Sequence, residues 1–464
     1  MAHVLNIVYG STTIALNTGS FRLLEYDPRT PDENEIRIES PFMDGAERPI
    51  ASYRNLGEVA RVAILGEGTI ATVQNAIRDI NRAFAQARRR QRTHLGDKVF
   101  LNYIPDGYSS TFRSEIIGGR AELSEGAMGW QWLDRNIEIR VAWERRFFWE
   151  GLEAQIPLTN ANGTGNTTGL AVWNHDDAGA GHDNYVEIAA ADVSGDLAAA
   201  PRLEITNTFN SSSRAYELSI AQNVQSSPAT FVHILEAEAG TGGTTSADAS
   251  CSGGSRKDLA WSVTTEAQLL SWTLDTTLLN ACAGNYFRML TRFASSPTYS
   301  DAWLRFRIKY GVSTIWEGPQ VLLASLPLLQ DLGVLQLPPY LVGAGDLSPL
   351  SLVLYGQRNQ SGTHTVYLDF VQLSALDGWR KLTPRGYGLA YGMRVIDDGI
   401  DDFLYADDGA TYKAGYYVGS GERIQVWPNA KQRLYFLHNN DTGGSQIDRT
   451  LSVKAFYRPR RLVI

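Results

Sequence analysis

The sequence predicts a mainly β protein built from several domains. Helix signals are scarce, short apolar runs typical of strands follow one another, and Gly, Asn, Ser or Asp turns separate these runs. The length of 464 residues suggests about three domains of ~150 residues. We predict an N-terminal α+β domain (1–150), a β-sandwich in two parts (151–228 and 376–464), and an inserted β-jelly-roll (229–375).

Residues 1–150 contain the clear helix signal of the chain, at 69–92. Apolar residues at spacings of three and four form one stripe there: Ile70, Val73, Ile77, Ile80, Phe84 and Ala87. Gly66 and Gly68 precede the helix, and Thr69 fits the N-cap position. The helix dipole favours cations at the C-terminal end, where four arginines gather: Arg88, Arg89, Arg90 and Arg92.

Strands follow this helix. Residues 98–119 predict two strands joined by a turn at Pro105-Asp106-Gly107. Residues 136–151 alternate apolar and charged side chains, which indicates a half-buried antiparallel strand. We therefore expect 1–150 to fold as one α+β unit.

Beyond residue 151 the pattern is almost wholly strands and turns. The segments 151–228 and 376–464 each contain few strands, but together they provide enough for a full sandwich. The segment between them, 229–375, is long enough to be an inserted jelly-roll. The glycine- and serine-rich stretch 240–255 predicts a mobile loop.

Composition is that of a soluble globular protein, with 43% hydrophobic and 20% charged residues. The 42 basic and 50 acidic residues give a net charge of −8, which argues against a dominant nucleic-acid or membrane surface. The N-terminus shows no signal peptide, and the most apolar stretch, 322–345, is broken by polar residues and prolines. We expect a cytosolic product without a membrane span.

The chain has two cysteines, Cys251 and Cys282. A disulfide between them would close a loop of about 30 residues and contribute ~3–4 kcal/mol in the chain-entropy model. The absence of a signal peptide lowers the odds of a disulfide. The sequence leaves their pairing open.

Standard catalytic motifs are absent. The sequence contains no G-x-S-x-G, Walker A, C-x-x-C or H-E-x-x-H motif. A glycoside hydrolase could still use carboxylates that are distant in sequence. We predict a protein without enzymatic activity and keep the hydrolase as an alternative.

Several polar clusters have both a functional and a structural interpretation. The histidines and aspartates of 173–184 could bind a metal, but glycines at the centre favour a hairpin loop. The two DDG groups of 396–409 fail the spacing of a calcium loop and favour hairpin turns. The arginines at the helix end and in 458–461 could contact nucleic acid, but solvated or interface arginines suit the acidic chain better.

Two glutamates end a strand-like run, FVHILEAEAG (231–240). On a strand, residues i and i+2 face the same side, so Glu236 and Glu238 would repel by roughly 3 kcal/mol at ~5–6 Å. Asp369 lies in a second strand, TVYLDFVQL (365–373), where Val366, Leu368 and Phe370 would face the other way. Three carboxylates suit Ca²⁺, and the alternative is a solvated strand edge.

The segment 229–375 is rich in Trp and Tyr, which could provide stacking surfaces for sugars. We expect most of these aromatic residues to lie in the core. Tyr299 is the best exposed candidate because 295–303 has the composition of a loop, and Trp303 follows it as a second candidate. The sequence predicts both as carbohydrate-binding residues.

The segment 229–375 resembles carbohydrate-binding jelly-rolls that open with an E-A-E strand and close with a strand carrying a single Asp. The resemblance implies a structural calcium ion bound by Glu236, Glu238 and Asp369. The middle of the segment matches the family in pattern only, so the resemblance places no sugar-binding residue.

The rest of the chain resembles a distal tail protein of a long-tailed (siphovirus-type) bacteriophage. The resemblance is carried by the helix before a strand pair in 69–119, the strand closing on RRFFWEG (145–151), and QRLYFLHNN with VKAFYRPRRL near the C-terminus. It implies a hexameric ring between tail tube and tail tip, and a galectin-like sandwich with added sugar-binding modules. It also implies a virion protein that is assembled in the host cytoplasm and has no catalytic residues.

The leading hypothesis is therefore a structural tail-tip protein. Its expected partners are its own copies, the tail-tube and tail-tip hub proteins, and host-surface polysaccharide through the jelly-roll. One alternative is a stand-alone carbohydrate-binding or adhesion protein, which would have no need of residues 1–150. The other is a glycoside hydrolase or lyase with an accessory binding module.

Overall fold

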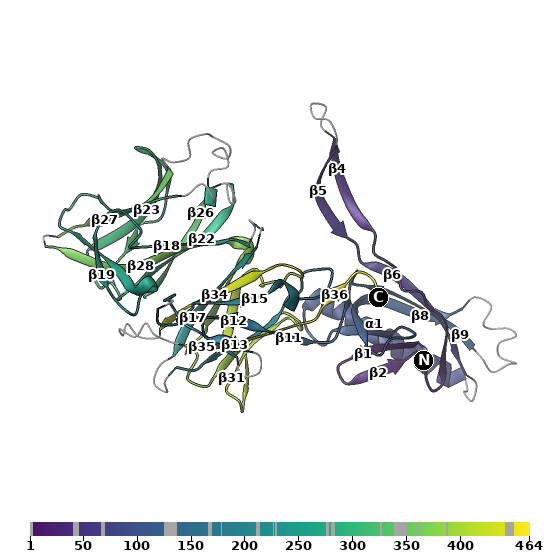
Figure 1. Ribbon diagram of the computed structural model, residues 1–464. Coiled ribbons are helices and arrows are strands. Elements are labelled where there is room, and N and C mark those ends of the chain that lie inside the picture. The colour runs from purple at the N-terminus through teal and green to yellow at the C-terminus, as the bar shows by residue number, and fades with distance from the viewer. Residues whose placement is uncertain are drawn as a thin grey trace. The chain divides into compact units, whose positions relative to one another are not determined.

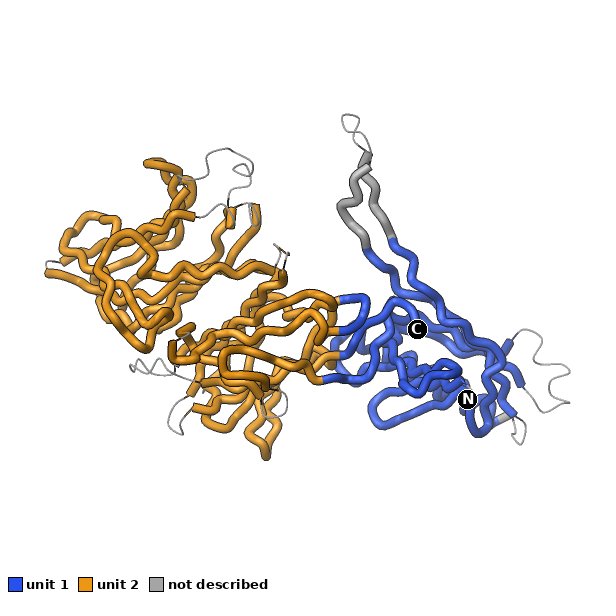
Figure 2. The backbone as a smooth tube through the Cα atoms, viewed as in Figure 1, with its two compact units in different colours: residues 1–154, 194–197, 458–464 blue, residues 155–193, 198–457 orange. Residues whose placement is uncertain are grey.

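The computed structural model describes residues 3–39, 46–65, 70–124, 137–165, 169–177, 179–209, 214–225, 227, 230–274, 278–279, 284–324, 327–337, 350–360, 362–386, 388–440 and 450–464. Figure 2 shows two compact units: unit 1 with 1–154, 194–197 and 458–464, and unit 2 with 155–193 and 198–457. Strands dominate both units (Figure 1), so the predicted mainly β fold class is confirmed.

Unit 1 is built on a nine-stranded sheet. Seven of its strands have the order β2-β1-β7-β8-β9-β6-β3, while β10 pairs with β8 and β36 pairs with β10. Neighbouring strands are antiparallel, and β9 alternates buried with exposed residues as predicted for 136–151. The strands are β1 (Val4–Tyr9), β2 (Thr12–Ala15), β3 (Phe21–Glu25), β6 (Leu56–Ile64), β7 (Val99–Ile104), β8 (Phe112–Leu123), β9 (Ile137–Arg145), β10 (Trp149–Glu150) and β36 (Arg460–Arg461).

The predicted helix is confirmed as α1 (Ile70–Thr93). Its stripe residues Val73, Ile80, Phe84 and Ala87 are buried in one cluster with the apolar side chains of the sheet. A Cβ at Gly119 of β8 would meet Ala142 O of the neighbouring strand at 2.6 Å and the Phe84 ring of the helix at 3.0 Å, so both neighbours require a glycine there. The predicted cap residues Gly66, Gly68 and Thr69 lie outside the described residues.

A separate two-stranded sheet belongs to unit 1. It consists of β4 (Glu33–Glu39) and β5 (Ala46–Tyr53), and within the described residues these strands pair only with each other. We call this element the β4–β5 ribbon. A network of buried polar residues lies at its base and is described with the functional sites.

Two seven-stranded sheets of unit 2 pack around one apolar core. Both contain strands from each of the predicted sandwich segments. The first flank sheet consists of β11 (Ala154–Ile156), β14 (Leu170–Val172), β16 (Arg202–Asn207), β30 (Arg394–Asp398), β31 (Phe403–Asp407), β32 (Tyr412–Ala414) and β35 (Leu451–Tyr457). The second flank sheet consists of β12 (Leu158–Asn160), β13 (Gly163–Gly165), β15 (Tyr185–Ile188), β17 (Ala215–Val224), β29 (Trp379–Pro384), β33 (Tyr417–Gly421) and β34 (Gln432–Asn440).

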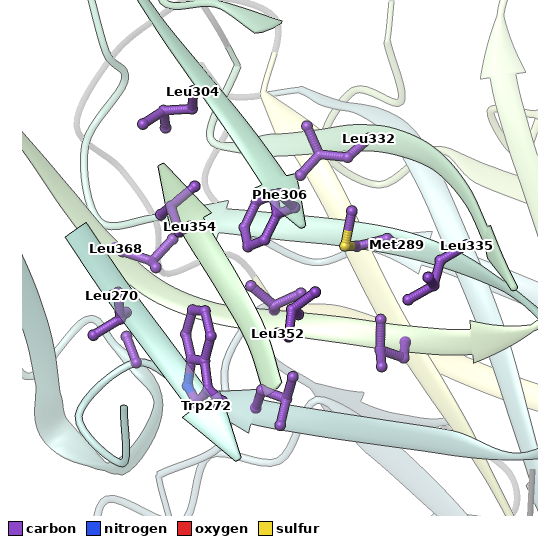
Figure 3. Packing of buried hydrophobic residues seen from close by; sticks show 14 of the residues in the cluster. Leu270, Trp272, Met289, Leu304, Phe306, Leu332, Leu335, Leu352, Leu354 and Leu368 are labelled. Atoms are coloured by element: carbon purple, nitrogen blue, oxygen red, sulfur yellow. The ribbon is translucent and has the colours of Figure 1, made fainter. Parts of the chain in front are cut away.

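The remaining strands of unit 2 come from the segment 229–375, which we call the insert. The inner sheet consists of β18 (Val232–Glu236), β19 (Thr244–Ala247), β20 (Ser255–Trp261), β22 (Tyr286–Phe293), β26 (Leu329–Gln336) and β28 (His364–Ala375). The outer sheet consists of β21 (Ala267–Thr273), β23 (Ala302–Tyr310), β24 (Ser313–Glu317), β25 (Val321–Leu322) and β27 (Leu350–Arg358). Figure 3 shows Met289 and Leu368 of the inner sheet pointing into the same space as Phe306 and Leu354 of the outer sheet.

The glycine- and serine-rich stretch 240–255 differs from its prediction as a mobile loop. It contains strand β19, which pairs with β20 from Thr244 opposite Asp258 to Ala247 opposite Ser255, and a 3₁₀ turn at Ser252–Gly254. Composition favoured mobility, but the backbone groups of this stretch obtain partners from the neighbouring strand.

Part of the second face of the inner sheet is also buried. Side chains of this face pack against the second flank sheet in two small clusters: Leu290, Leu329, Phe370 and Ile234 with Leu437, and Val232 and Ile234 with Ala221 and Tyr435. Asn439 of β34 also accepts from the Leu329 N–H (2.8 Å) and donates to the Leu329 carbonyl (2.9 Å). We call this contact the insert–flank interface.

Candidate functional site

The glutamates Glu236 and Glu238 lie where β18 ends. Glu236 is the last residue of the strand, and the chain then turns, with hydrogen bonds from Ala239 N to Glu236 O (3.3 Å) and from Gly240 N to Ala237 O (3.0 Å). The two glutamates are therefore brought together by a turn, whereas the sequence predicted a continuous strand. Their carboxylates still repel each other, and this repulsion adds to burial in raising the pKa of Glu236.

Asp369 sits at an irregularity of β28. In the pairing with β22, Arg292 is opposite Phe370 and Phe293 is opposite Leu368, so Asp369 is an extra residue of a β-bulge. The bulge inverts the alternation of side chains. The prediction that Phe370 shares a face with Val366 and Leu368 is therefore wrong: Phe370 belongs to the insert–flank interface, whereas the other two face the core of the insert.

The carboxylate of Asp369 is paired with a guanidinium. Arg292 donates to one oxygen of Asp369, and both side chains are fully buried. The second oxygen of Asp369 accepts from Ser252 N (2.8 Å), and Arg292 also donates to Ser250 O (3.1 Å). The charge of Asp369 is thus balanced by protein groups alone.

The glutamates have a different environment from Asp369. Burial, together with the Glu238 and Asp176 carboxylates, raises the pKa of Glu236 to about 8. The Oε2 atoms of Glu236 and Glu238 are buried, and the described residues give neither a hydrogen-bond partner. Gly253 has a φ of +62°, which favours glycine, and a Cβ there would lie 2.8 Å from Glu238 Oε1.

These observations test the predicted calcium ligands. The two glutamates fit a cation, because they offer buried, unpartnered carboxylate oxygens. Asp369 fits less well, because Arg292 already neutralises it. The described residues contain no group of three His, Cys, Asp or Glu side chains arranged for a metal ion.

The polar hairpin 173–184 forms a turn that contacts the insert. Asp177 and His182 pair across it, as predicted for a hairpin loop, and the rings of His175 and His182 are joined by a hydrogen bond of 3.0 Å. Asp176 N donates to Ser252 Oγ (3.2 Å), and Gly253 N donates to Asp176 O (2.8 Å). Burial and the nearby positive charge of Arg292 lower the pKa of His175 to about 3.

The two predicted carbohydrate-binding residues have different surroundings. The Tyr299 hydroxyl donates to Thr365 O (3.1 Å), and its ring lies 4.2 Å from that of His364 while packing against the core of the insert. Tyr299 therefore has an evident packing role. Trp303 lies on the solvent side of the outer sheet, opposite Gln357 of β27, and is partly exposed.

The remaining candidates have structural contacts. Arg88, in the arginine-rich end of α1, donates from Nη1 to Gly119 O (2.6 Å). In the 458–461 segment, the Arg460 guanidinium carbon lies 4.3 Å from the centre of the Phe148 ring. Cys251 is a buried free thiol among the described residues, and burial raises its pKa to about 12. Cys282 lies outside the described residues.

In unit 1 a buried charge network fixes both ends of the β4–β5 ribbon. Arg145 and Glu58 form an ion pair of 2.7 Å with no exposed side-chain surface. Glu58 also accepts from Arg29 N (2.9 Å) before β4, from Tyr26 Oη (2.9 Å) and from Trp143 Nε1 (3.2 Å). Since Glu58 lies in β6, which follows β5, the network joins the two chain segments that flank the ribbon.

Sequence reasoning missed Arg292 and Arg145. In β22 the alternation places Arg292 on the face opposite to the buried Phe287 and Met289, which suggests that this arginine faces solvent. The alternation of β9 instead places Arg145 on the buried face with Val141 and Trp143. The signal that could have found Arg292 is the run Leu368-Asp369-Phe370-Val371 in β28, where apolar residues at consecutive positions indicate burial on both faces. A charged residue beside such a strand needs a buried partner, and Asp369 is the acidic residue of that strand.

No family model matches this chain, and no curated protein matches it. Thirteen chains of solved structures match, among them the three that follow. The Dit (gp 19.1) protein of SPP1, described as a paradigm of the hub adsorption apparatus in phages infecting Gram-positive hosts, has a TM-score of 0.34 and 8% identity over 98% of this chain and 99% of that chain. A chain of the phage P2 baseplate in its activated conformation with Ca has a TM-score of 0.31 and 7% identity over 100% of both chains.

The third structure is the VP2 subviral particle of infectious bursal disease virus. Its TM-score is 0.18 with 9% identity, over 67% of this chain and 81% of that chain. At these scores and identities the likenesses do not establish a shared fold.

Within the described residues, no helix combines the length and apolar character that a membrane crossing requires.

Proposed function

We propose that this chain is a structural virion protein, a distal tail protein of a long-tailed bacteriophage, which forms a ring between tail tube and tail tip. The β4–β5 ribbon carries the proposal, because its strands pair only with each other among the described residues. An isolated two-stranded ribbon is marginally stable in water. Contact with a second copy of the chain would supply the surface that the ribbon needs.

The base of the ribbon supports this role. The ion pair between Glu58 and Arg145 is buried, and Arg145 Nη2 also donates to Arg29 O (3.2 Å). Arg29 precedes β4, while Glu58 follows β5. A ribbon that is fixed at both ends enters a contact with little loss of conformational entropy, which favours assembly.

A groove in unit 1 suits the ribbon of a neighbouring copy. It has a volume of about 680 Å³ and lies between the end of α1 and strands β6, β8 and β9. Its lining includes three arginines, Arg88, Arg92 and Arg120, and two glutamates, Glu58 and Glu144. The sequence of β4, ENEIRIE, has three glutamates and one arginine, so its net charge is opposite to that of these side chains.

Electron microscopy of the purified full-length chain, with and without the tail-tube protein, tests ring formation. We expect rings from the wild-type chain, and monomers when residues 33–53 are replaced by a glycine–serine linker. The replaced chain should keep its melting temperature, because the ribbon pairs with no other described strand. Trp303→Ala is the matched control and should still form rings; a wild-type chain that stays monomeric at every concentration overturns the proposal.

The finer proposal is that the insert points outward and contacts host-surface glycans. Partly exposed Trp303 supports it more than Tyr299, whose hydroxyl and ring are engaged by Thr365 and His364. Tight glycan binding by a chain that never forms rings would favour a stand-alone adhesion protein. Release of reducing sugar from host polysaccharide, abolished by a carboxylate substitution, would favour the hydrolase.

Calcium binding at Glu236, Glu238 and Asp369 also remains a proposal. The unpartnered oxygens of the glutamates support it, whereas the pairing of Asp369 with Arg292 does not. Calcium at 100 times its dissociation constant would stabilise the fold by about 2.7 kcal/mol. We expect calcium to raise the melting temperature of the wild type but not of Glu238→Gln; equal melting with calcium and with EDTA contradicts the site.

A further inference from the structure

The outer sheet of the insert has one face in the core and one face toward solvent. In β23, Leu304 and Phe306 are buried in the core, while Trp303, Arg305 and Arg307 alternate with them and remain partly exposed. The neighbouring strand β27 places Tyr355 opposite Arg305 and Gln357 opposite Trp303. We call Trp303, Arg305, Arg307, Tyr355, Gln357, Glu266 and Glu317 the outer-sheet face.

The charged residues of this face hold one another in place. Glu317 of β24 accepts from Arg305 Nη1 (2.6 Å) and Arg307 Nε (2.7 Å). From the other side, Glu266 lies 2.7 Å from Arg307 Nη1 and 3.9 Å from Arg305 Nη1. Two arginines and two glutamates leave no net charge, but they present an ordered set of donors and acceptors.

Aromatic and amide groups adjoin these charges. The Arg307 guanidinium lies 4.7 Å from the centre of the Tyr355 ring. Next to Trp303, Gln357 Oε1 accepts from Gln320 Nε2 (3.1 Å). The outer-sheet face therefore combines an indole, a phenol and planar polar groups on one rigid sheet.

One donor of the face has no partner. Arg305 Nε is buried, and the described residues offer it no hydrogen-bond acceptor, although the other end of the guanidinium is paired. A buried donor without an acceptor costs free energy. Ordinary surface ion pairing explains the arginine–glutamate contacts, but it explains neither this donor nor the adjoining aromatic residues.

We propose that the outer-sheet face binds a neutral, polyhydroxylated oligosaccharide. Sugar hydroxyl groups both donate and accept, so they complement alternating guanidinium, carboxylate and amide groups, and the C–H faces of sugar rings stack on aromatic rings. The cancelling charges select against strongly anionic or cationic ligands. Trp303 supplies the stacking surface, and Arg305 supplies a fixed donor.

This inference rests on the proposed contact of the insert with host glycans and specifies its site and ligand class. The position of these residues on a β-sheet favours binding, because a ligand that contacts a preformed sheet face requires no rearrangement of the backbone. Part of the second face of the inner sheet, around Leu290 and Phe370, packs against the second flank sheet and is closed to a ligand. The outer-sheet face has no such cover from the flank sheets among the hydrophobic clusters of the described residues.

The test measures binding of the full-length chain to an array of neutral hexose and N-acetylhexosamine oligosaccharides. Oligogalacturonates and glycerol-phosphate oligomers serve as anionic probes. We expect at least one neutral oligosaccharide to bind, and Trp303→Ala to weaken it at least tenfold. Arg305→Lys should also weaken binding, because lysine keeps the charge but lacks the planar fork.

Tyr286→Ala provides the matched control, since Tyr286 is an exposed aromatic residue (51%) of the inner sheet and should leave binding unchanged. Melting temperatures confirm that each variant is folded. Absence of neutral glycan binding, binding of anionic probes alone, or binding that survives Trp303→Ala overturns the inference. Ring formation by the same variants reports separately on the proposed tail-tip function.

Discussion

The two sheets of the insert carry arginine–carboxylate pairs in opposite environments. Arg292 and Asp369 of the inner sheet have no exposed side-chain surface, whereas Arg307 and Glu317 of the outer sheet are 18% and 44% exposed. Both pairs are close and hydrogen-bonded. The comparison shows that the contact distance alone does not set how much stability is lost when one partner is removed. The loss also depends on whether water can reach the charge that remains.

The inner sheet owes this environment to the insert–flank interface. Phe370 and Leu290 pack toward the second flank sheet, so the inner sheet is dry on both faces around Arg292 and Asp369. The outer sheet has only one dry face. We therefore expect inner-sheet substitutions to act on stability, and outer-sheet substitutions to act on binding.

Asp369→Asn should have the largest effect, because it leaves Arg292 as an uncompensated buried charge. Breaking a buried pair in this way costs about 3–5 kcal/mol. Urea unfolding of the full-length chain measures the loss. Glu317→Gln in the outer sheet is the matched control, and equal losses in the two variants would remove the distinction between the sheets.

Asn439→Ala tests the polar part of the insert–flank interface. The Leu329 N–H and carbonyl would both lose their partner, and an unsatisfied buried group costs about 1–3 kcal/mol. Unfolding experiments should show this loss in the transition that reports the insert. Gln268→Ala, at an exposed position of β21, is the control and should change the free energy of unfolding little. An equally small change in Asn439→Ala would show that water reaches the Leu329 backbone groups at the insert–flank interface.

Glu236 should make stability depend on pH. Its pKa is about 8 in the folded chain, above the ordinary value of 4.5, so its contribution is complete below pH 4.5 and is lost as pH rises through 8. His175 acts in the opposite direction, because its pKa falls from 6.5 to about 3 and its contribution is lost as pH falls through that range. The two effects oppose each other between pH 4.5 and 6.5 and separate above pH 6.5.

Between pH 6.5 and 8 we expect stability to fall by up to about 1.4 kcal/mol per pH unit, which is the free energy of one pKa unit. Glu236→Gln should abolish this slope, since glutamine does not titrate. Denaturant titrations without divalent cations at several pH values measure it. A slope that persists in Glu236→Gln would assign the pH dependence to another group.

Glu317→Gln should have the smallest effect. Exposed ion pairs contribute about 0.2–1 kcal/mol, and salt screens them. We expect a loss within this range that shrinks at high salt, together with weaker glycan binding. A loss as large as that of Asp369→Asn would show that the outer-sheet face is buried in solution.

Much of the fold follows from the sequence. The apolar stripe of 69–92 predicted α1, and alternation in 136–151 predicted β9, because both patterns are local and repeat with the period of the element. The hairpin at 173–184 was also predicted correctly. The extent of the insert and the calcium, glycan and ring assignments stay predictions.

The sites were less predictable. Alternation placed Phe370 beside Leu368, but the bulge at Asp369 moves it to the other face. Residues 240–255 have the composition of a loop, yet β20 provides their backbone with partners. In both cases a neighbouring strand that is distant in sequence decides the outcome, and no local pattern reports it.

Local sequence patterns were enough to predict the mainly β class, the helix and the position of the acidic pair at the end of a strand. The pairing of Asp369 with Arg292, the dry surroundings of that pair, and the shared face of Trp303, Arg305 and Tyr355 became visible in the folded chain. The physical reason is that periodicity depends on neighbours along one strand, whereas charge partners and solvent exposure depend on the register between strands and on which sheet covers which.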